Sequence, residues 1–183
     1  LGREVAIKIL PAGLAVEADF RTRFEREARA IASLRHENIV QVFDFGDIKD
    51  TYYMVMEYIE GTDLGSKMSQ GKGLPLEEVA VIGRQIAGAL DYAHQQGFVH
   101  RDVKPSNVML ESQDSHVRAV LTDFGIAKLR AGDTGATKTG MLMGTLNYIA
   151  PEQIRSSGEV DYRADIYSLG VMLYQMITGE LPF

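Results

Sequence analysis

The sequence contains no cysteine, so disulfide bonds and zinc sites built on thiolates are excluded. Positive charge is in deficit, because 19 lysines and arginines stand against 25 aspartates and glutamates, for a net charge of −6. This acidic balance argues against binding to the phosphate backbone of nucleic acid. Long apolar runs are also missing, and the longest, residues 167–177, is too short to cross a bilayer. We interpret that run as a buried helix and expect no membrane contact within this segment.

The remaining composition is that of a globular protein. The 183 residues are 45% hydrophobic and 24% charged, which is enough for one sizeable core or two small lobes. No signal peptide or internal repeat is visible. Because the chain begins at Leu1 and stops at Phe183, we interpret both ends as cuts. We expect a cytoplasmic location for this segment, whether or not the parent protein is anchored in a membrane.

The order of the expected elements divides the chain in two. Apolar spacing and turn residues predict a strand through 5–9, a helix over 16–34, strands over 39–46 and 51–59, a helix over 76–94, strands over 107–110 and 119–122, and a helix over 163–178. This order predicts an α+β fold. A small β-rich lobe (1–56), a hinge (57–62) and a mainly helical lobe (63–183) would leave a cleft between the lobes.

A lysine in the first strand raises the first question of function. With a period of two residues, Val5, Ile7 and Ile9 share one face of the strand, whereas Ala6 and Lys8 share the other. One interpretation is a solvent-facing lysine on an edge strand. The other is a cation held on a face that small residues leave open, and the rest of the chain decides between them.

Glu27, on the first predicted helix, offers a partner for that lysine. Its spacing from Phe24 and Ile31 places the carboxylate near the apolar edge that faces the strands. Two partners stay open at this point: Arg23, four residues away on a solvated face, and Lys8.

The segment HRDVKPSN, residues 100–107, carries the densest set of chemical groups. It places Asp102, Lys104 and Asn107 within six positions and includes Pro105, which stiffens the loop. Where a phosphoryl group is handled, a carboxylate can accept a hydroxyl proton, an ammonium can neutralise phosphate charge and an asparagine oxygen can bind a hard cation. The alternative is a polar surface loop with an Asx turn.

Asp123 begins the motif DFG directly after an apolar strand. Asp123 and Asn107 lie at the ends of two neighbouring predicted strands, and two oxygen donors placed in this way suit Mg²⁺. For DFG alone, an ordinary turn is the alternative. The long Gly- and Thr-rich loop over 130–145 is of a kind that is usually functional or mobile.

Five motifs occur in the order found in protein kinases: VAIK at 5–8, Glu27, HRDVKPSN at 100–107, DFG at 123–125 and APE at 150–152. Over essentially its whole length, the chain resembles the catalytic domain of bacterial Hanks-type serine/threonine kinases. The resemblance implies a two-lobed protein-kinase fold with an incomplete N-lobe and an incomplete C-lobe. It also implies transfer of the ATP γ-phosphate to serine and threonine hydroxyls of proteins.

The resemblance implies a role for each motif residue. Asp102 would be the catalytic base, and Lys104 would steady the γ-phosphate. Asn107 and Asp123 would bind Mg²⁺, with Mn²⁺ as an alternative. The residues that would bind ATP are Ala6, Lys8, Glu27, Met56, Glu57, Ile59, Met109 and Asp123.

Within this ATP site, the resemblance implies that Lys8 pairs with Glu27 and holds the α- and β-phosphates. Ala6 and Met109 would sandwich the adenine. The backbone of Glu57 and Ile59 would bond the adenine edge, with Met56 behind it.

Arg101, immediately before the base, indicates control by phosphorylation of the loop 126–149, because an arginine can pair with a phosphate and order a segment. Thr137 and Thr139 occupy the positions of autophosphorylation sites in similar bacterial kinases, and Thr145 would lie near the substrate. The alternative is that these threonines merely populate a polar loop.

Two further residues would be structural. Asp165 would brace the loop that carries the base, although by itself it could be a plain helix-start residue. Glu152 belongs to the APE motif, and its expected arginine partner lies in later helices that this chain lacks.

The chain departs from the family pattern at its start. Only Leu1 to Glu4 precede VAIK, so the glycine-rich turn that covers the phosphates is absent. Because positioning supplies most of phosphoryl-transfer catalysis, we expect these 183 residues alone to be weakly active or inactive.

The partners follow from the same resemblance. We expect protein substrates with serine or threonine, and a dimer of kinase domains is one arrangement open to autophosphorylation in trans. A pseudokinase-like ATP-binding or scaffolding module is the alternative function. A small-molecule kinase is a weaker one, since such enzymes seldom carry a loop of this kind between DFG and APE.

Overall fold

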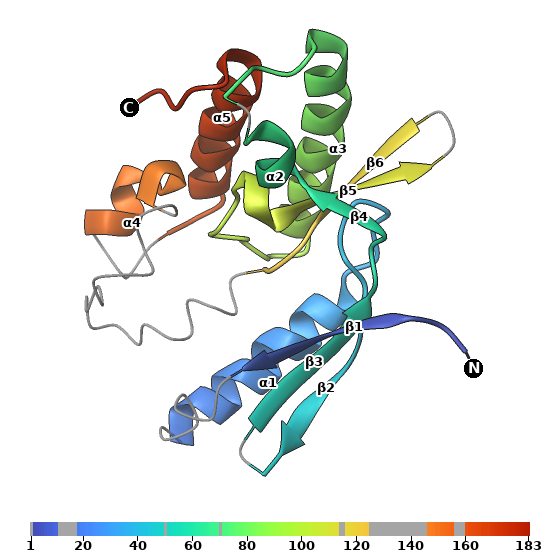
Figure 1. Cartoon of the computed structure of the whole chain (residues 1–183). Helices are drawn as coiled ribbons and strands as arrows, with labels where there is room; N and C mark the ends of the chain where they lie inside the picture. Colours follow the sequence, from blue (N-terminus) through green and yellow to red (C-terminus); the bar gives the residue numbers. More distant parts are fainter. Residues whose placement is uncertain are drawn as a thin grey trace.

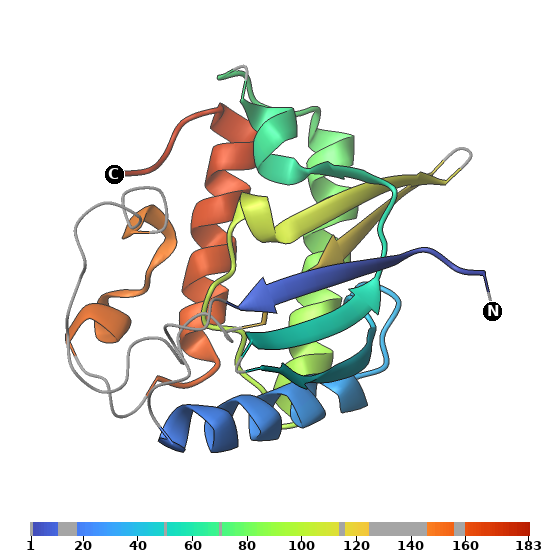
Figure 2. The same cartoon turned by 60° about the horizontal axis from the view of Figure 1, so that its bottom comes forward.

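The first half of the chain forms an antiparallel sheet covered by one helix. The computed structural model describes residues 2–10, 18–49, 51–69, 71–113, 116–124, 146–155 and 160–183. Strand β3 (Thr51–Glu57) lies between β1 (Val5–Leu10) and β2 (Val42–Ile48). Helix α1 (Ala18–Ser33) packs against β2 and crosses the sheet (Figures 1 and 2).

The second half is mainly helical, around a smaller antiparallel sheet of β4 (Gly61–Asp63), β5 (Val108–Gln113) and β6 (His116–Leu121). Its helices are α2 (Leu64–Met68), α3 (Leu76–Gln95), α4 (Pro151–Arg155) and α5 (Arg163–Thr178). Helices α3 and α5 pack together, at the top of Figure 1. The described residues therefore have the predicted two-part α+β architecture.

Strand β1 alternates as predicted, and its two faces differ in burial. Ile7 and Ile9 are 59% and 65% exposed, although they are apolar. The side chain of Lys8 is only 30% exposed. The interpretation of Lys8 as a solvent-facing lysine is therefore wrong, because the open side of this edge strand is the one that carries the isoleucines.

Helix α5 corrects a second expectation, that the apolar run 167–177 would form a buried helix. One face of α5 is buried, with Met172 and Met176 fully covered. The other face exposes Ile166, Tyr174 and Ile177 by 55%, 47% and 50%. The helix packs on α3 and on the turn Leu146–Tyr148, and these contacts leave three of its ten apolar positions exposed.

The segment between α1 and β2 joins the two halves of the fold. The Val40 N–H donates to the Leu121 carbonyl at 3.0 Å, and the Leu121 N–H donates to the Asn38 carbonyl at 2.8 Å. The buried Asn38 side chain donates through Nδ2 to Ala119 O and Gln85 Oε1, both at 2.8 Å. This segment is thus fixed to the edge of β6.

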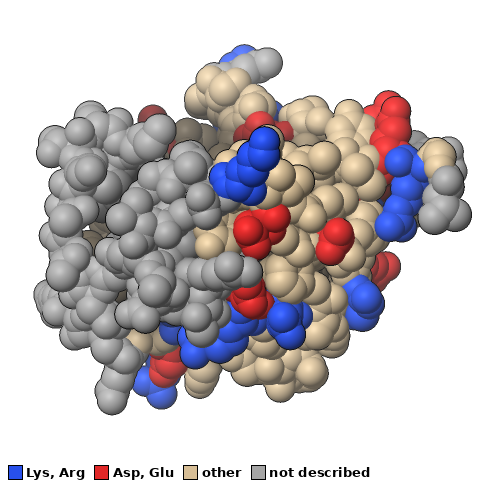
Figure 3. Space-filling model, turned by 90° about the horizontal axis from the view of Figure 1, so that it is seen from below, with Lys and Arg blue, Asp and Glu red and all other residues tan. Residues whose placement is uncertain are grey.

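The surface carries charged side chains of both signs. Acidic and basic side chains are interspersed on the face seen in Figure 3. Within the described ranges, no helix combines the length and apolar character that a membrane span requires.

Candidate active site

Lys8 lies beside Asp123 at the junction of the two halves. Its Nζ is 2.5 Å from Asp123 Oδ1, an ion pair between β1 and the segment after β6. A pair this exposed contributes at most about 1 kcal/mol to stability, so its interest is chemical: it sets a cation next to a carboxylate. The pairing of Lys8 with Glu27, which is half-buried on α1, stays a prediction.

The HRDVKPSN segment folds so that its three chemical groups meet. Pro105 begins a 3₁₀ turn, Pro105–Asn107, because its fixed φ suits the first position of such a turn. Lys104 Nζ lies 2.9 Å from Asp102 Oδ2. Asn107 Nδ2 donates to the same oxygen at 2.9 Å and to the Asp102 carbonyl at 2.8 Å. The other oxygen, Asp102 Oδ1, accepts no hydrogen bond from the described residues.

Asp165 holds the backbone that leads to Asp102. It is fully buried on α5 and accepts the N–H of His100 through Oδ2 and that of Arg101 through Oδ1, both at 2.7 Å. His94 Nε2 lies 2.8 Å from Oδ2. These contacts hold Arg101 in the left-handed region with a φ of 64°. Asp123 also has a positive φ, 59°, so both sides of the site carry backbone strain of a kind found at functional positions.

His100 connects this loop to Asp123. Its buried ring packs on Phe124 with centroids 4.5 Å apart, and its Nε2 lies 2.9 Å from the Thr122 carbonyl. The Asp102 N–H donates to Nδ1 at 3.2 Å, so the partners assign the proton to Nε2. Burial lowers the pKa of His100, although the carboxylates of Asp165, Asp102 and Asp123 act in the opposite direction. The imidazole is therefore neutral in the folded protein.

This buried histidine predicts a loss of stability in mild acid. Below a pH of about 6.5, the unfolded chain protonates His100 while the folded chain does not, so the free energy of unfolding falls. The slope is at most about 1.4 kcal/mol per pH unit and ends at the lowered pKa of the folded state. Urea unfolding across this range should show a smaller slope for His100→Gln than for wild type, while His116→Gln, at an exposed position, keeps the wild-type slope. Equal slopes for all three proteins would contradict the prediction.

Asn107 and Asp123 fit a hard divalent cation. The Asn107 carbonyl accepts the N–H of Thr122, the residue before Asp123, at 2.9 Å. Asn107 is buried and its Nδ2 is engaged with Asp102, which leaves the amide oxygen as its ligand atom. Carboxylate and amide oxygens are the ligands that Mg²⁺ prefers.

An apolar cluster lies beside the end of β3. Val40, Ile59 and Val120 are buried together, with Met56 and Met109 packed against them. Ala6 pairs with Met56 across β1 and β3. The predicted adenine contacts are thereby placed around one junction of the two sheets.

The regulatory and structural predictions fall partly outside the described residues. Thr137, Thr139 and Thr145 lie outside them. Glu152 is exposed on α4. Arg101 is exposed, and its carbonyl accepts a hydrogen bond from Gln153 Nε2 at 3.1 Å, which connects the loop to the same helix.

Several residues at the site were not singled out by the sequence. They are His94, His100, Asn38, Gln85 and Arg118. His100 was visible as the first residue of HRD, but nothing in its spacing indicates burial. Arg118 lies between Val117 and Ala119 in β6 and has no motif around it.

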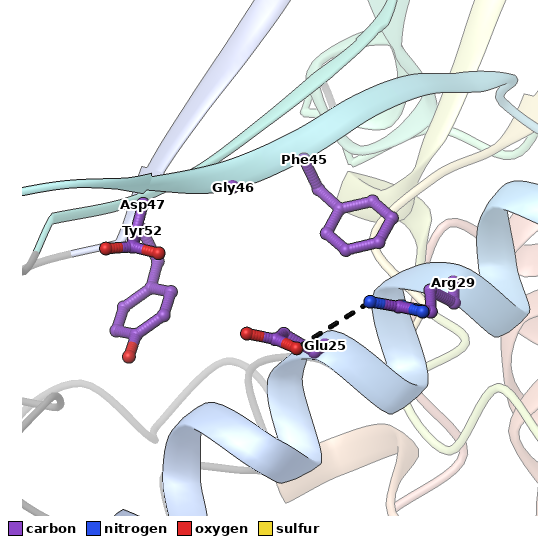
Figure 4. A pocket seen from close by; sticks show the side chains of 6 residues that line it. All are labelled: Glu25, Arg29, Phe45, Gly46, Asp47 and Tyr52. Carbon is purple, nitrogen blue, oxygen red and sulfur yellow. Dashed lines mark ion pairs between the residues drawn. The ribbon is translucent and has the colours of Figure 1, made fainter.

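A pocket of about 160 Å³ lies away from these groups, between α1 and the strands β2 and β3. It is lined by Glu25, Arg29, Phe45, Gly46, Asp47 and Tyr52 (Figure 4). Glu25 and Arg29 form an ion pair of 3.8 Å along the helix. None of the residues predicted to bind ATP lines it.

Fold and site together define a two-lobed α+β protein with a lysine–aspartate pair and an aspartate–lysine–asparagine cluster where its halves meet. PknJ, a serine/threonine-protein kinase of Mycobacterium tuberculosis, is 44% identical over 184 residues, which cover 100% of this chain and 31% of that protein. The crystal structure of the Mycobacterium tuberculosis PknI kinase domain is 36% identical, with a TM-score of 0.78, and the match covers 100% of this chain and 67% of that one. Rad53 in complex with AMP-PNP is 34% identical with a TM-score of 0.79, over 100% of this chain and 43% of that one.

The sequence profile of the protein kinase domain matches residues 1–183, and the chain belongs to that family. The predicted membership and fold class are thereby confirmed. The chain spans about a third of the length of PknJ.

Proposed function

We propose that this chain is the catalytic part of a serine/threonine protein kinase that transfers the γ-phosphate of ATP to protein hydroxyls. The observation that carries the proposal is the contact of Lys104 and Asn107 with one oxygen of Asp102, while its other oxygen accepts nothing from the described residues. That arrangement holds a carboxylate in place and leaves an acceptor for a substrate proton. The similarity to bacterial serine/threonine kinases supports it.

Each group of the cluster has a task in this reaction. Asp102 Oδ1 accepts the hydroxyl proton of the substrate as the substrate oxygen attacks the γ-phosphorus, and the bond from that phosphorus to the β,γ-bridging oxygen breaks to release ADP. Lys104, beside that carboxylate, offsets negative charge on the transferring phosphoryl group. Asp165 keeps the loop in position through the backbone of His100 and Arg101.

The nucleotide site uses both halves of the fold. We propose that Lys8 binds the α- and β-phosphates and that Asn107 and Asp123 hold Mg²⁺, or Mn²⁺ in its place. A bound divalent cation supplies charge neutralisation of the phosphates. The Lys8–Asp123 ion pair supports this, because it shows that the proposed phosphate and metal ligands reach the same place. Rad53, which was solved with AMP-PNP, is a structural neighbour.

The purine is proposed to sit at the end of β3. The backbone of Glu57 and Ile59 would bond its edge, and the apolar cluster with Met56 and Met109 would contact its faces. The change from one sheet to the other after Glu57 supports the assignment of residues 57–62 as the hinge between lobes 1–56 and 63–183.

The reaction itself tests the proposal. The chain, expressed with any residues that flank it in its gene, is incubated with ATP, Mg²⁺ and a generic protein substrate, and phosphoserine and phosphothreonine are mapped. Transfer that stops when EDTA removes the metal is the expected result. Binding of ATP without transfer to any protein would favour the pseudokinase-like binding module instead.

The loop after DFG gives a further prediction. If phosphate at Thr137 or Thr139 pairs with Arg101 and orders the active site, the double variant Thr137→Ala, Thr139→Ala should lose most autophosphorylation and at least about tenfold in activity toward other proteins. Phosphosite mapping checks this, with Thr134→Ala as the matched control. Phosphates found elsewhere in the loop, with neither threonine modified, would contradict it.

Substrates and assembly complete the proposal. Proteins that present serine or threonine are the proposed partners, acted on in the cytoplasm, and the chain is proposed to phosphorylate itself within a dimer of kinase domains.

A further inference from the structure

Arg118, on β6, lies between carboxylates from the two halves of the fold. Its Nη1 donates to Glu57 Oε1 at 2.9 Å and to Glu111 Oε2 at 3.1 Å. Its Nε donates to the Glu37 carbonyl at 2.9 Å. One partly buried guanidinium therefore connects the end of β3, strand β5 and the segment between α1 and β2.

The charges make this contact hard to replace. Burial would lower the pKa of Arg118, but the hydrogen bonds and charges of Glu57 and Glu111 outweigh it and raise the pKa. A single nitrogen serves both carboxylates, so the two acids lie close together on either side of this cation. Without the cation, the two acids would repel each other and separate.

Glu57 is also held to Gln41 by two hydrogen bonds. Its N–H donates to the Gln41 carbonyl at 2.8 Å, and its Oε2 accepts the Gln41 N–H at 3.3 Å. Glu57 ends β3 and begins the segment 57–62 that leads into the second sheet. The position of Arg118 therefore sets where this connecting segment starts relative to β5 and β6.

We infer that Arg118 is a positioning residue for the purine: by holding Glu57 to β5 and β6, it sets the backbone of 57–62 in the conformation that binds the base. This inference rests on the proposed function, since it concerns the base end of the same nucleotide site. Arginine is required because its planar head donates through Nη1 and Nε at once, whereas a lysine at this position carries the charge but cannot reach all three acceptors.

Binding of adenosine and of ATP, compared among variants, distinguishes this positioning role from a general loss of structure. The chain, expressed with any residues that flank it in its gene, is titrated with both ligands by calorimetry. Arg118→Met should weaken the binding of both ligands by about tenfold, because the substitution disturbs the segment that binds the base, which both ligands carry. Lys8→Met should weaken the binding of ATP but leave the affinity for adenosine within about twofold of wild type, because adenosine has no phosphate. Arg118→Lys should fall between Arg118→Met and wild type, and Arg84→Met, which removes an exposed arginine on α3, should match wild type.

Turnover gives the second readout. For Arg118→Met, the KM for ATP should rise about tenfold while kcat and the KM for the protein substrate stay within about twofold. In a background of Glu57→Gln, the further effect of Arg118→Met on adenosine binding should be much smaller, because the acid that it positions is already neutral.

The outcomes separate the two proposals. If wild type binds neither ligand, or binds ATP without transferring phosphate, the proposed function fails. If wild type binds and transfers but Arg118→Met binds adenosine as wild type does, or loses kcat and both KM values together, the inference about Arg118 is wrong.

Discussion

Replacing Asp102 by asparagine is expected to lower kcat for phosphoryl transfer by about 10²- to 10⁴-fold. Asparagine keeps the shape of the side chain and can still accept the hydrogen bond from Asn107 Nδ2 through its amide oxygen. It cannot take up the hydroxyl proton, and it no longer carries the charge that Lys104 contacts at 2.9 Å. The KM for ATP should change little, because the proposed nucleotide contacts are made by other residues.

Steady-state kinetics with a saturating protein substrate measures this effect. Asp91→Asn, at an exposed position on α3, is the matched control and should keep wild-type kcat. A kcat for Asp102→Asn within a few-fold of wild type would show that Asp102 is not the base.

Replacing Asp165 by alanine is expected to cost about 3–5 kcal/mol in the free energy of unfolding. The fully buried carboxylate accepts the N–H groups of His100 and Arg101 and contacts the His94 ring. Alanine would leave the buried His100 N–H and the part-buried Arg101 N–H without this acceptor, and the left-handed Arg101 would lose the contact that holds it. Activity should fall together with stability, because Asp102 follows Arg101 directly.

Urea unfolding measures the change in the free energy of unfolding of Asp165→Ala, and steady-state kinetics measures the change in its kcat. Asp165→Asn keeps one acceptor oxygen and should lose less stability than alanine, which keeps the test informative if Asp165→Ala does not fold. Asp91→Ala, which removes an exposed carboxylate, should lie within about 0.5 kcal/mol of wild type. A similarly small change for Asp165→Ala would contradict the bracing role.

Local patterns predicted much of this architecture. The last helix has the predicted bounds, 163–178, because its apolar run is nearly continuous and Gly179 ends it with a φ of 80°. The alternation of β1 was predicted as well. The strands β5 and β6 extend further than expected, since their outer residues are polar and carry no apolar signal.

Contacts between distant segments could not be predicted in the same way. The sequence placed Lys8 beside a small residue but gave no means of ranking Asp123, which is 115 positions away, as its partner. Arg118 contacts Glu111 as its cross-strand partner in the β5–β6 hairpin, but its contacts with Glu57 and with the Glu37 carbonyl join distant segments that no local spacing connects. The exposed positions of α5, Ile166, Tyr174 and Ile177, were not predicted because hydropathy reports how apolar a helix is and not which of its faces is covered.

Labelled ATP tests most directly whether Asp102 supports transfer of the γ-phosphate to protein. The chain, expressed with any residues that flank it in its gene, is incubated with Mg²⁺ and ATP labelled on either the γ- or the α-phosphate, beside its Asp102→Asn variant. We expect label on serine or threonine from the γ-phosphate only, and only when Asp102 is intact. Label from the α-phosphate, equal label on the variant, or no label from a protein that binds ATP would contradict it.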